Sequence, residues 1–297
     1  METSIETSLL ETAVEAAKAA GKLLLERRRT GFSIAKKGRV NLVTEADLAS
    51  ERLIVERIRR RFPTHRVLAE EGGNGGGEAE FRWVIDPLDG TTNYAHGYPC
   101  FCVSIGVERQ DELVVGVVFD PLRRELFTAR RGSGAFLNGR PIHVSSEEVL
   151  EDSLLCTGFS YQPEEIAGNL KLFSAVMMAA RSVRRDGSAA LDLCYVACGR
   201  FDGFWELSLN PWDVAAGMLI LREAGGKVTR FDGTPGTIHD RECLATNGRI
   251  HEPLAAILRG ESGVGKRDTG VRTRDTGVRK QDTGVRKQDT GGSHAGH

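Results

Sequence analysis

The chain has 297 residues, of which 40% are hydrophobic, enough to bury a sizeable core as one large domain or two lobes. Its 40 basic and 41 acidic residues nearly cancel, and a net charge of -1 gives no global attraction to nucleic acid or to anionic membranes. The apolar runs are strand-sized, shorter than the ~20 residues that span a bilayer, and the first residues lack the features of a secretory signal. The six cysteines form no disulfide framework, so we expect reduced thiols in a cytoplasmic protein.

The first half of the chain alternates helices and strands. Apolar spacing predicts a helix over residues 5–29, followed by a basic loop at 36–39. A second helix begins near Thr44, where Thr44 to Asp47 has the pattern of a capping box, and it ends before Pro63. Strands are expected at 67–69 and 83–85, with a glycine-rich loop at 72–77 between them. Two or three further strands over 101–127 complete a first lobe, residues 1 to about 145.

The second half repeats this alternation, from about residue 146 to 262. Helices are expected at 163–180, 188–198, 212–224 and 250–258, and strands at 154–156, near 183, at 201–205 and at 243–246. Because strands and helices alternate in blocks, the fold class is predicted to be mixed α/β with layered sheets and helices. Both lobes together, residues 1–262, would form one folded unit.

Residues 263–297 differ in composition from everything before them. From Lys266 onward there are 8 basic and 4 acidic residues, a charge of +4, so the remainder carries -5. Asp-Thr-Gly-Val-Arg recurs at seven-residue intervals with a single apolar residue in each copy. Such a tract buries too little surface to offset the ordering entropy, so we expect a disordered low-complexity tail. The functional alternative is a weak polyanion-binding tail.

Carboxylates placed at the ends of predicted elements are the main functional signal. Asp86 and Asp89 directly follow a hydrophobic strand, and two neighbouring carboxylates repel each other unless a cation lies between them. Mg²⁺ takes oxygen ligands and keeps several waters, so a few carboxylates suffice to bind it. Gly90-Thr91-Thr92 then opens a helix whose free N–H groups would favour a phosphate. The pattern therefore predicts metal-assisted phosphoryl chemistry.

Three other acidic positions support this interpretation, although each has a structural alternative. Glu70-Glu71 follows a predicted strand, Asp47 lies on the capped helix, and Asp213 lies at a helix N-terminus, where a carboxylate can serve only as a cap. The Asp-Pro-Leu-Asp-Gly-Thr segment could likewise be an ordinary turn. No Ser-His-Asp or Cys-His set suggests covalent catalysis, and the histidines are interpreted as structural or surface groups.

The spaced motifs resemble the inositol monophosphatases, within the superfamily of lithium-sensitive, Mg²⁺-dependent phosphatases. The resemblance covers about residues 5–258. It is carried by Asn41–Asp47 (NLVTEAD), Glu70-Glu71, Trp83–Asn93 (WVIDPLDGTTN), Gly187–Asp192 (GSAALD), and Trp212–Gly217 (WDVAAG) with Glu223–Gly226 (EAGG). From Gly187 to Gly226 the chain is most similar to bacterial members.

The resemblance implies a fold, a cofactor and roles for individual residues. The fold would be an alternating α-β-α-β-α sandwich like that of inositol monophosphatases and fructose-1,6-bisphosphatases, usually in a homodimer. One Mg²⁺ would be held by Glu70, Asp86 and the Leu88 carbonyl. A second Mg²⁺ would be held by Asp86, Asp89 and Asp213, and Glu70 would face a third. Thr91, coupled to Asp47, would orient and deprotonate the attacking water, while the Gly90 and Thr91 N–H groups receive the phosphate. The polyol would contact Asp89, Gly187, Ser188, Ala189, Glu206 and Asp213.

The leading hypothesis is hydrolysis of myo-inositol monophosphate by attack of metal-activated water. The same chemistry on fructose 1,6-bisphosphate, histidinol phosphate or a nucleotide 3′-phosphate is the near alternative, because selectivity depends on a few loops. A different class of function is a regulatory, RNA-associated role on a phosphatase scaffold, with the basic tail contacting RNA. One departure from the family pattern is Asp186, which could alter substrate preference or pair with Arg184 or Arg185.

Overall fold

The computed structural model describes residues 2–37, 41–72, 79–160 and 163–261. The loop predicted over 72–77, apart from Gly72, and the tail predicted over 263–297 lie outside these residues. The helices are α1 (Glu2–Thr30), α2 (Glu45–Arg61), α3 (Thr91–Ala95), α4 (Pro163–Ala179), α5 (Ala189–Ala197), α6 (Pro211–Glu223) and α7 (His251–Leu258), with a 3₁₀ turn at Leu150–Asp152.

The strands form two main sheets and one small hairpin. The seven-stranded sheet has the order β3 (Arg66–Ala69), β4 (Phe81–Asp89), β5 (Cys102–Arg109), β6 (Glu112–Asp120), β7 (Glu125–Arg130), β8 (Ala135–Leu137), β9 (Arg140–Ile142). The five-stranded sheet has the order β11 (Ser182–Arg184), β10 (Leu154–Thr157), β12 (Gly203–Leu207), β14 (Glu242–Thr246), β13 (Lys227–Thr229). The hairpin pairs β1 (Ile34–Lys37) with β2 (Asn41–Thr44). The loop expected from Lys36 was therefore wrong at its start, because pairing with β2 makes Lys36 and Lys37 strand residues.

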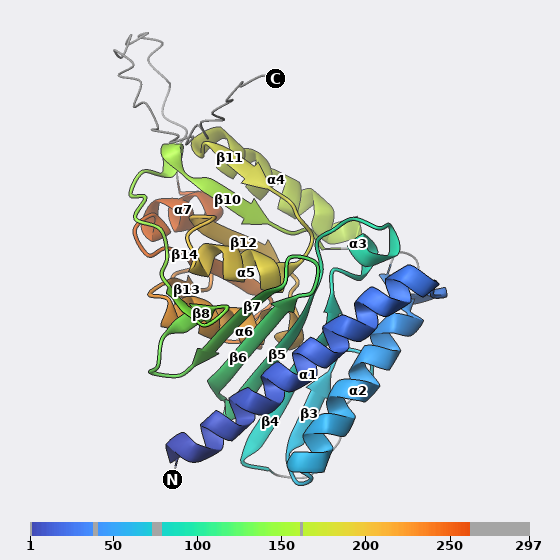
Figure 1. Ribbon diagram of the computed structural model, residues 1–297. Helices are drawn as coiled ribbons and strands as arrows, with labels where there is room; N and C mark the ends of the chain where they lie inside the picture. Colours follow the sequence, from blue (N-terminus) through green and yellow to red (C-terminus); the bar gives the residue numbers. More distant parts are fainter. Residues whose placement is uncertain (1, 38–40, 73–78, 161–162, 262–297) are drawn as a thin grey trace, which may run out of the picture. The chain divides into compact units, whose positions relative to one another are not determined.

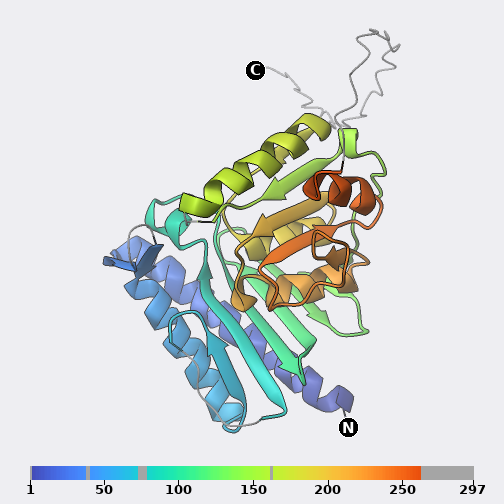
Figure 2. The same ribbon diagram turned by 180° about the vertical axis from the view of Figure 1, so that it is seen from behind.

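These elements stack as alternating layers of helices and sheets, which confirms the predicted mixed α/β class. Helices α1 and α2 cover one face of the seven-stranded sheet, and α5 and α6 lie between the two sheets (Figure 1). Helices α4 and α7 cover the outer face of the five-stranded sheet, as the reverse view in Figure 2 also shows. Because α6 faces a sheet on both sides, every residue from Val214 to Leu221 is buried.

The sequence features that predicted the start and the end of α2 are present in the structure. The Thr44 hydroxyl accepts hydrogen bonds from the backbone N–H groups of Ala46 and Asp47, and the Asp47 carboxylate accepts one from the Thr44 N–H at 2.8 Å. This is the reciprocal capping box expected from the sequence. The helix ends at Arg61, two residues before Pro63, as predicted.

Helix α6 approaches the seven-stranded sheet unusually closely, because two glycines face it. A Cβ on Gly106 of β5 would lie 2.7 Å from Ala215 Cβ, and one on Gly116 of β6 would lie 2.7 Å from the Ala216 carbonyl oxygen. Any larger residue at either position would push the helix away from the sheet. This packing fixes where the N-terminus of α6, with Asp213, lies relative to β4 and β5.

Candidate active site

The first two acidic side chains come together through parallel strand pairing. The register of β3 and β4 pairs Ala69 with Ile85, and the Glu70 N–H donates to the Ile85 carbonyl at 3.3 Å. Glu70, just beyond β3, therefore lies beside Asp86 of β4. Parallel strands end at the same edge of a sheet, which explains how two segments 16 positions apart supply neighbouring carboxylates.

A β-bulge orients the two aspartates of β4. The expectation that this strand stops at Ile85 was wrong, since β4 continues to Asp89. Along the neighbouring β5, Asp86 pairs with Ser104 and Asp89 with Cys102, so three steps on β4 match two on β5. In a regular strand, residues three apart point to opposite faces, but the extra residue turns both carboxylates into the same pocket.

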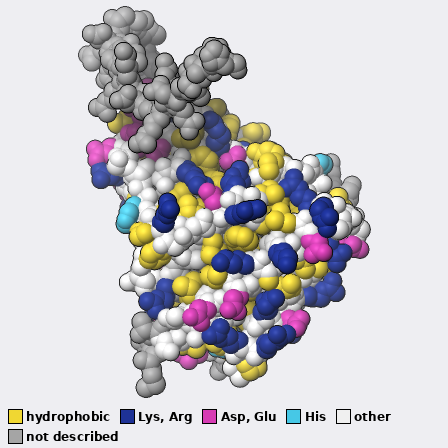
Figure 3. Space-filling view, viewed as in Figure 1, with side chains coloured by type: hydrophobic (Ala, Val, Ile, Leu, Met, Phe, Trp, Pro, Cys, Tyr) yellow, Lys and Arg dark blue, Asp and Glu magenta, His cyan; other side chains and the backbone are white. Residues whose placement is uncertain are grey.

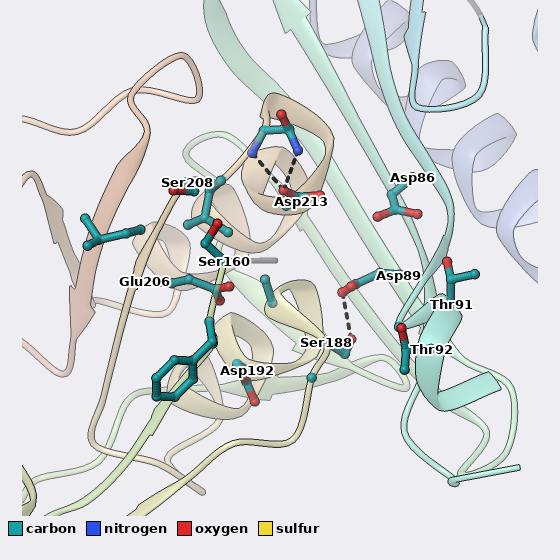
Figure 4. Close-up of a pocket in the computed structure, with 18 of the residues that line it drawn as sticks. Asp86, Asp89, Thr91, Thr92, Ser160, Ser188, Asp192, Glu206, Ser208 and Asp213 are labelled. Carbon is teal, nitrogen blue, oxygen red and sulfur yellow. Dashed lines mark hydrogen bonds between the residues drawn. The ribbon is translucent and has the colours of Figure 1, made fainter. Parts of the chain in front are cut away.

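Asp213 reaches the site from the start of α6. Its Oδ2 accepts hydrogen bonds from the Asn210 N–H at 2.7 Å and the Asn210 side-chain amide at 3.3 Å (Figure 4). The capping role considered from the sequence is therefore present, but it engages one carboxylate oxygen only. Oδ1 makes no hydrogen bond to another described residue, and Asp213 lines the same pocket as Asp86 and Asp89. One carboxylate can thus cap the helix and still bind a ligand.

The electrostatics of this group suit a divalent cation. Burial, followed by the charges of Glu70, Asp89 and Asp213, raises the pKa of Asp86 well above its usual value. Burial likewise raises the pKa of Asp213 to about 7, and that of Asp89 to about 6 despite hydrogen bonds from Ser188 and Ala190. Buried carboxylates that repel one another are a fitting donor set for Mg²⁺, which would neutralise them.

The segment after Asp89 contributes backbone groups and a hydroxyl. Gly90 has a φ of 91°, and a Cβ there would lie 2.8 Å from the Cys100 carbonyl, so this turn into α3 requires glycine. The Thr91 hydroxyl lies 3.0 Å from both Asp47 Oδ1 and the Leu88 carbonyl oxygen. Burial raises the pKa of Asp47, while hydrogen bonds from Thr44 and Thr91 oppose this shift. Asp47 is thus a buried acceptor placed behind Thr91.

The start of α5 closes another side of the site. Asp89 Oδ2 accepts hydrogen bonds from the Ser188 hydroxyl at 2.7 Å and the Ala190 N–H at 2.8 Å. Gly187, with a φ of 84°, makes the turn into this helix. The side-chain amide of Asn93 donates to the carbonyl of Asp186 at 2.8 Å and so ties this turn to α3. These bonds connect the two sheets across the pocket.

These elements enclose a pocket of about 380 Å³. Most of the residues predicted as site residues line it: Glu70, Asp86, Leu88, Asp89, Gly90, Thr91, Gly187, Ser188, Ala189, Glu206 and Asp213. Asp47 does not line the pocket and reaches it through Thr91. Glu206 lies on the side away from Asp86 and Thr91 (Figure 4). Burial and then the charge of Asp213 raise the pKa of Glu206 to about 8, while the positive charge of Arg185 lowers it.

Several lining residues were missed by the sequence reasoning. They are Gly158, Phe159, Ser160, Arg185, Asp192, Leu207, Ser208, Leu209, Asn210 and Arg241. Asp192 is 1% exposed, and its Oδ1 has no hydrogen-bond partner among the described residues. Its place in the Gly187–Asp192 motif was the available signal. The hypothesis that Asp186 pairs with Arg184 or Arg185 was wrong for the described residues, since the structure contains no such ion pair and Arg184 donates to Ser182 and Val183 instead.

A second acidic group lies outside the pocket and already has a cation. Glu108, Asp111 and His239 bring ligand atoms close together, but the Arg82 guanidinium contacts all three, at 3.3 Å from Asp111 and 3.2 Å from His239. This group therefore already has a cationic partner, whose positive charge would oppose the binding of a metal ion. All six cysteines are free thiols, and no described helix is long and apolar enough to cross a membrane.

Comparison with known proteins is consistent with this geometry. The model of the inositol monophosphatase family matches residues 6–262. The chain belongs to the inositol monophosphatase family. An inositol-1-monophosphatase from Synechocystis sp. is 50% identical over 252 residues, covering 84% of this chain and 88% of that protein. The family is Mg²⁺-dependent, in agreement with the acidic donor set.

Solved structures of family members share the fold. The inositol monophosphatase from Anabaena (Nostoc) sp. PCC 7120 is 48% identical, with a TM-score of 0.77 over 86% of this chain and 96% of that one. Some members carry another name. The Nus factor SuhB of Escherichia coli K12 is 42% identical over 257 residues, covering 85% of this chain and 96% of that protein.

Proposed function

We propose that this family member is a Mg²⁺-dependent phosphomonoesterase that hydrolyses myo-inositol monophosphate to inositol and phosphate. The convergence of Glu70, Asp86, Asp89 and Asp213 on one pocket, beside the backbone turn at Gly90, is the observation that carries this proposal. The relatives named inositol-1-monophosphatase support the reaction class and this substrate. Residues 1–262 would form the catalytic domain, with the two main sheets in its two lobes.

We further propose how the acidic side chains hold the cations. Glu70, Asp86 and the Leu88 carbonyl would bind one Mg²⁺, and Asp86, Asp89 and Asp213 a second. Glu70 would also face a third ion. When bound, Mg²⁺ lowers the pKa of water and stabilises charge on phosphoryl oxygens. The raised pKa values of Asp86, Asp89 and Asp213 support these assignments, since burial disfavours the charged form of each carboxylate and a bound cation would favour it.

Thr91 and Asp47 would handle the proton of the attacking water. In this proposal the Thr91 hydroxyl accepts a hydrogen bond from the water and donates its own proton toward Asp47 Oδ1, 3.0 Å away. The Oδ2 atom of Asp47 is held in place by two hydrogen bonds from Thr44, so Oδ1 keeps a fixed direction toward Thr91. The backbone N–H groups of Gly90 and Thr91 would receive the phosphate as hydrogen-bond donors.

The leaving polyol would occupy the other half of the pocket. Gly187, Ser188 and Ala189 would contact it from the turn into α5, and Glu206 would accept hydrogen bonds from its hydroxyls together with Asp89 and Asp213. The position of Glu206 supports this role, because its carboxylate borders the pocket and forms no hydrogen bond with another described residue. A hydroxyl-rich ligand would supply the missing donors.

The test is phosphate release from inositol 1-phosphate with Mg²⁺, with EDTA, and with lithium, which we expect to inhibit. Activity that survives both EDTA and Asp89→Asn would contradict the mechanism. A panel with fructose 1,6-bisphosphate, histidinol phosphate and a nucleotide 3′-phosphate at fixed Mg²⁺ identifies the preferred leaving group. Higher kcat/KM on one of these would reassign the substrate while leaving the reaction class in place.

We also propose that two copies associate through α4. This helix exposes Ile166, Leu170 and Met177 along one stripe, with Leu170 52% exposed. A surface helix with apolar side chains on its solvent-facing side, as well as on the side that packs on the sheet, fits a buried interface. Light scattering coupled to size exclusion should give twice the chain mass. Leu170→Glu should give the single mass, and an unchanged dimer would contradict this placement.

A role in RNA binding is the weaker candidate. Relatives named Nus factor SuhB support it, as does the basic composition of the sequence after residue 265. Figure 3 shows Lys and Arg side chains spread over one face, but apolar and acidic side chains separate them instead of leaving one basic surface. Filter binding with and without residues 266–297 tests it, and equal RNA affinity would remove the tail from this role.

Six free thiols support a reducing, cytoplasmic location.

A further inference from the structure

Gly158 occupies a position where the pocket has no room for a side chain. It directly follows β10, whose parallel register with β12 pairs Thr157 with Trp205, so the next pair of positions is Gly158 and Glu206. The Thr157 hydroxyl donates to the Trp205 carbonyl at 2.6 Å and fixes the two strand ends together. A Cβ on Gly158 would lie 2.0 Å from Glu206 Oε1 and 2.1 Å from Cδ and Oε2. The carboxylate therefore fills the space that any other residue's Cβ would take.

The backbone itself does not require glycine here. The φ of Gly158 is outside the left-handed region, unlike that of Gly90 or Gly187, so an alanine could adopt the same backbone conformation. The nearest atoms to a new Cβ all belong to the end of the flexible Glu206 side chain. A substitution would consequently move this carboxylate first and the surrounding chain little.

No described residue holds Glu206 in this direction through a hydrogen bond or an ion pair. Among the residues that the structure describes, its carboxylate forms no hydrogen bond and no ion pair, whereas Asp89 and Asp213 are each fixed by two or more bonds. The direction of Glu206 is thus determined by shape, and Gly158 supplies the space for it. Once forced out of that space, the carboxylate would have no bond to a described residue that keeps it facing the pocket.

We propose that Gly158 is a positioning residue for substrate selectivity, which holds the Glu206 carboxylate toward the hydroxyls of the leaving group. This rests on the proposed function, in which Glu206 contacts the polyol. A larger residue at position 158 would turn Glu206 away and favour leaving groups that need no acceptor there. Selectivity within this fold would then depend on a glycine that itself touches no reacting atom.

The test compares two ring substrates, inositol 1-phosphate and cyclohexyl phosphate, which lacks the hydroxyls. In Gly158→Ala we expect the ratio of their kcat/KM values to fall about 10- to 100-fold, the usual effect of losing a hydrogen bond between a substrate and a charged group. The loss should come mainly from KM for inositol 1-phosphate. Gly168→Ala is the matched control, because a Cβ there meets nothing within 4 Å, and its ratio should equal that of the wild type.

A double-mutant cycle separates this role from a general structural one. In a Glu206→Ala background, Gly158→Ala should change the ratio by less than about twofold, because both substitutions remove the same contact. If the two substitutions lower the ratio of kcat/KM values independently, so that their fold-changes multiply in the double variant, the proposal is overturned. If Gly158→Ala does not fold, the double variant should fold, since the clash is gone, and its failure to fold would also overturn the inference. A wild type that hydrolyses neither ester would instead reject the proposed function.

Discussion

Replacing Asp89 by Asn tests the cation site while preserving the shape of the side chain. Asp89 Oδ2 accepts hydrogen bonds from Ser188 Oγ at 2.7 Å and from the Ala190 N–H at 2.8 Å. If the new amide nitrogen took that position, the Ala190 N–H would face another donor, at a cost of ~1–3 kcal/mol. The amide oxygen should therefore stay with Ser188 and Ala190, which turns the NH₂ group toward Asp86. An NH₂ group has no lone pair available for a cation, so one ligand is lost.

The expected result is a large loss of activity in a folded protein. Transition-state stabilisation by a catalytic cation amounts to several kcal/mol, so kcat/KM should fall by about 10²- to 10⁴-fold. Without Mg²⁺ the midpoint of thermal unfolding should match or exceed that of the wild type, because a repelling charge is gone. Mg²⁺ at about 100 times its dissociation constant should stabilise the wild type by ~2.7 kcal/mol and the variant by less.

Two measurements check this reasoning, phosphate release across a Mg²⁺ titration and thermal unfolding with and without Mg²⁺. Asp111→Asn is the matched control, because Asp111 lies at the exposed β5–β6 turn outside the pocket and has a φ of 64°, which Asn adopts readily. A variant at position 89 with more than about a tenth of wild-type kcat/KM at saturating Mg²⁺ would refute the assignment. So would an undiminished rise in its unfolding temperature on adding Mg²⁺.

Three further outcomes are expected. In EDTA, the free energy of unfolding should fall as pH rises from about 4 through about 7, because raised carboxyl pKa values, such as that of Asp213 at about 7, make the folded protein bind more protons than the unfolded chain. Urea titrations at several pH values measure this free energy, and a rise over that pH range would contradict the prediction. Thr91→Val should lower kcat by about 10²-fold or more while the thermal stabilisation by Mg²⁺ persists, and a loss of both would indicate a metal-binding role instead. Gly106→Ala should destabilise the fold by ~1–3 kcal/mol, because its Cβ would lie 2.7 Å from that of Ala215; an unchanged unfolding midpoint would show that α6 shifts freely.

Local patterns in the sequence were sufficient to name most of the site. The capping box at Thr44 depends on residues three apart, so the start of α2 could be predicted directly, and with it the position of Asp47. The helix expected from residue 212 likewise placed Asp213 in the first turn of α6, which begins at Pro211. The run from Trp83 to Thr91 combines a strand with a glycine turn, both of which are local features. Motif resemblance then indicated which of these carboxylates belong to one site.

Long-range packing decided how those residues meet. The bulge that turns Asp86 and Asp89 to one side exists only in the pairing of β4 with β5, and a regular strand would have separated them. The closeness of Asp213 depends on two glycines of the sheet beneath α6. The space for the Glu206 carboxylate likewise arises where β10 and β12 pair, 48 positions apart, at a glycine that carries no local signal. Strand register and the distance from helix to sheet are set by contacts between distant segments. A local sequence pattern does not contain those contacts.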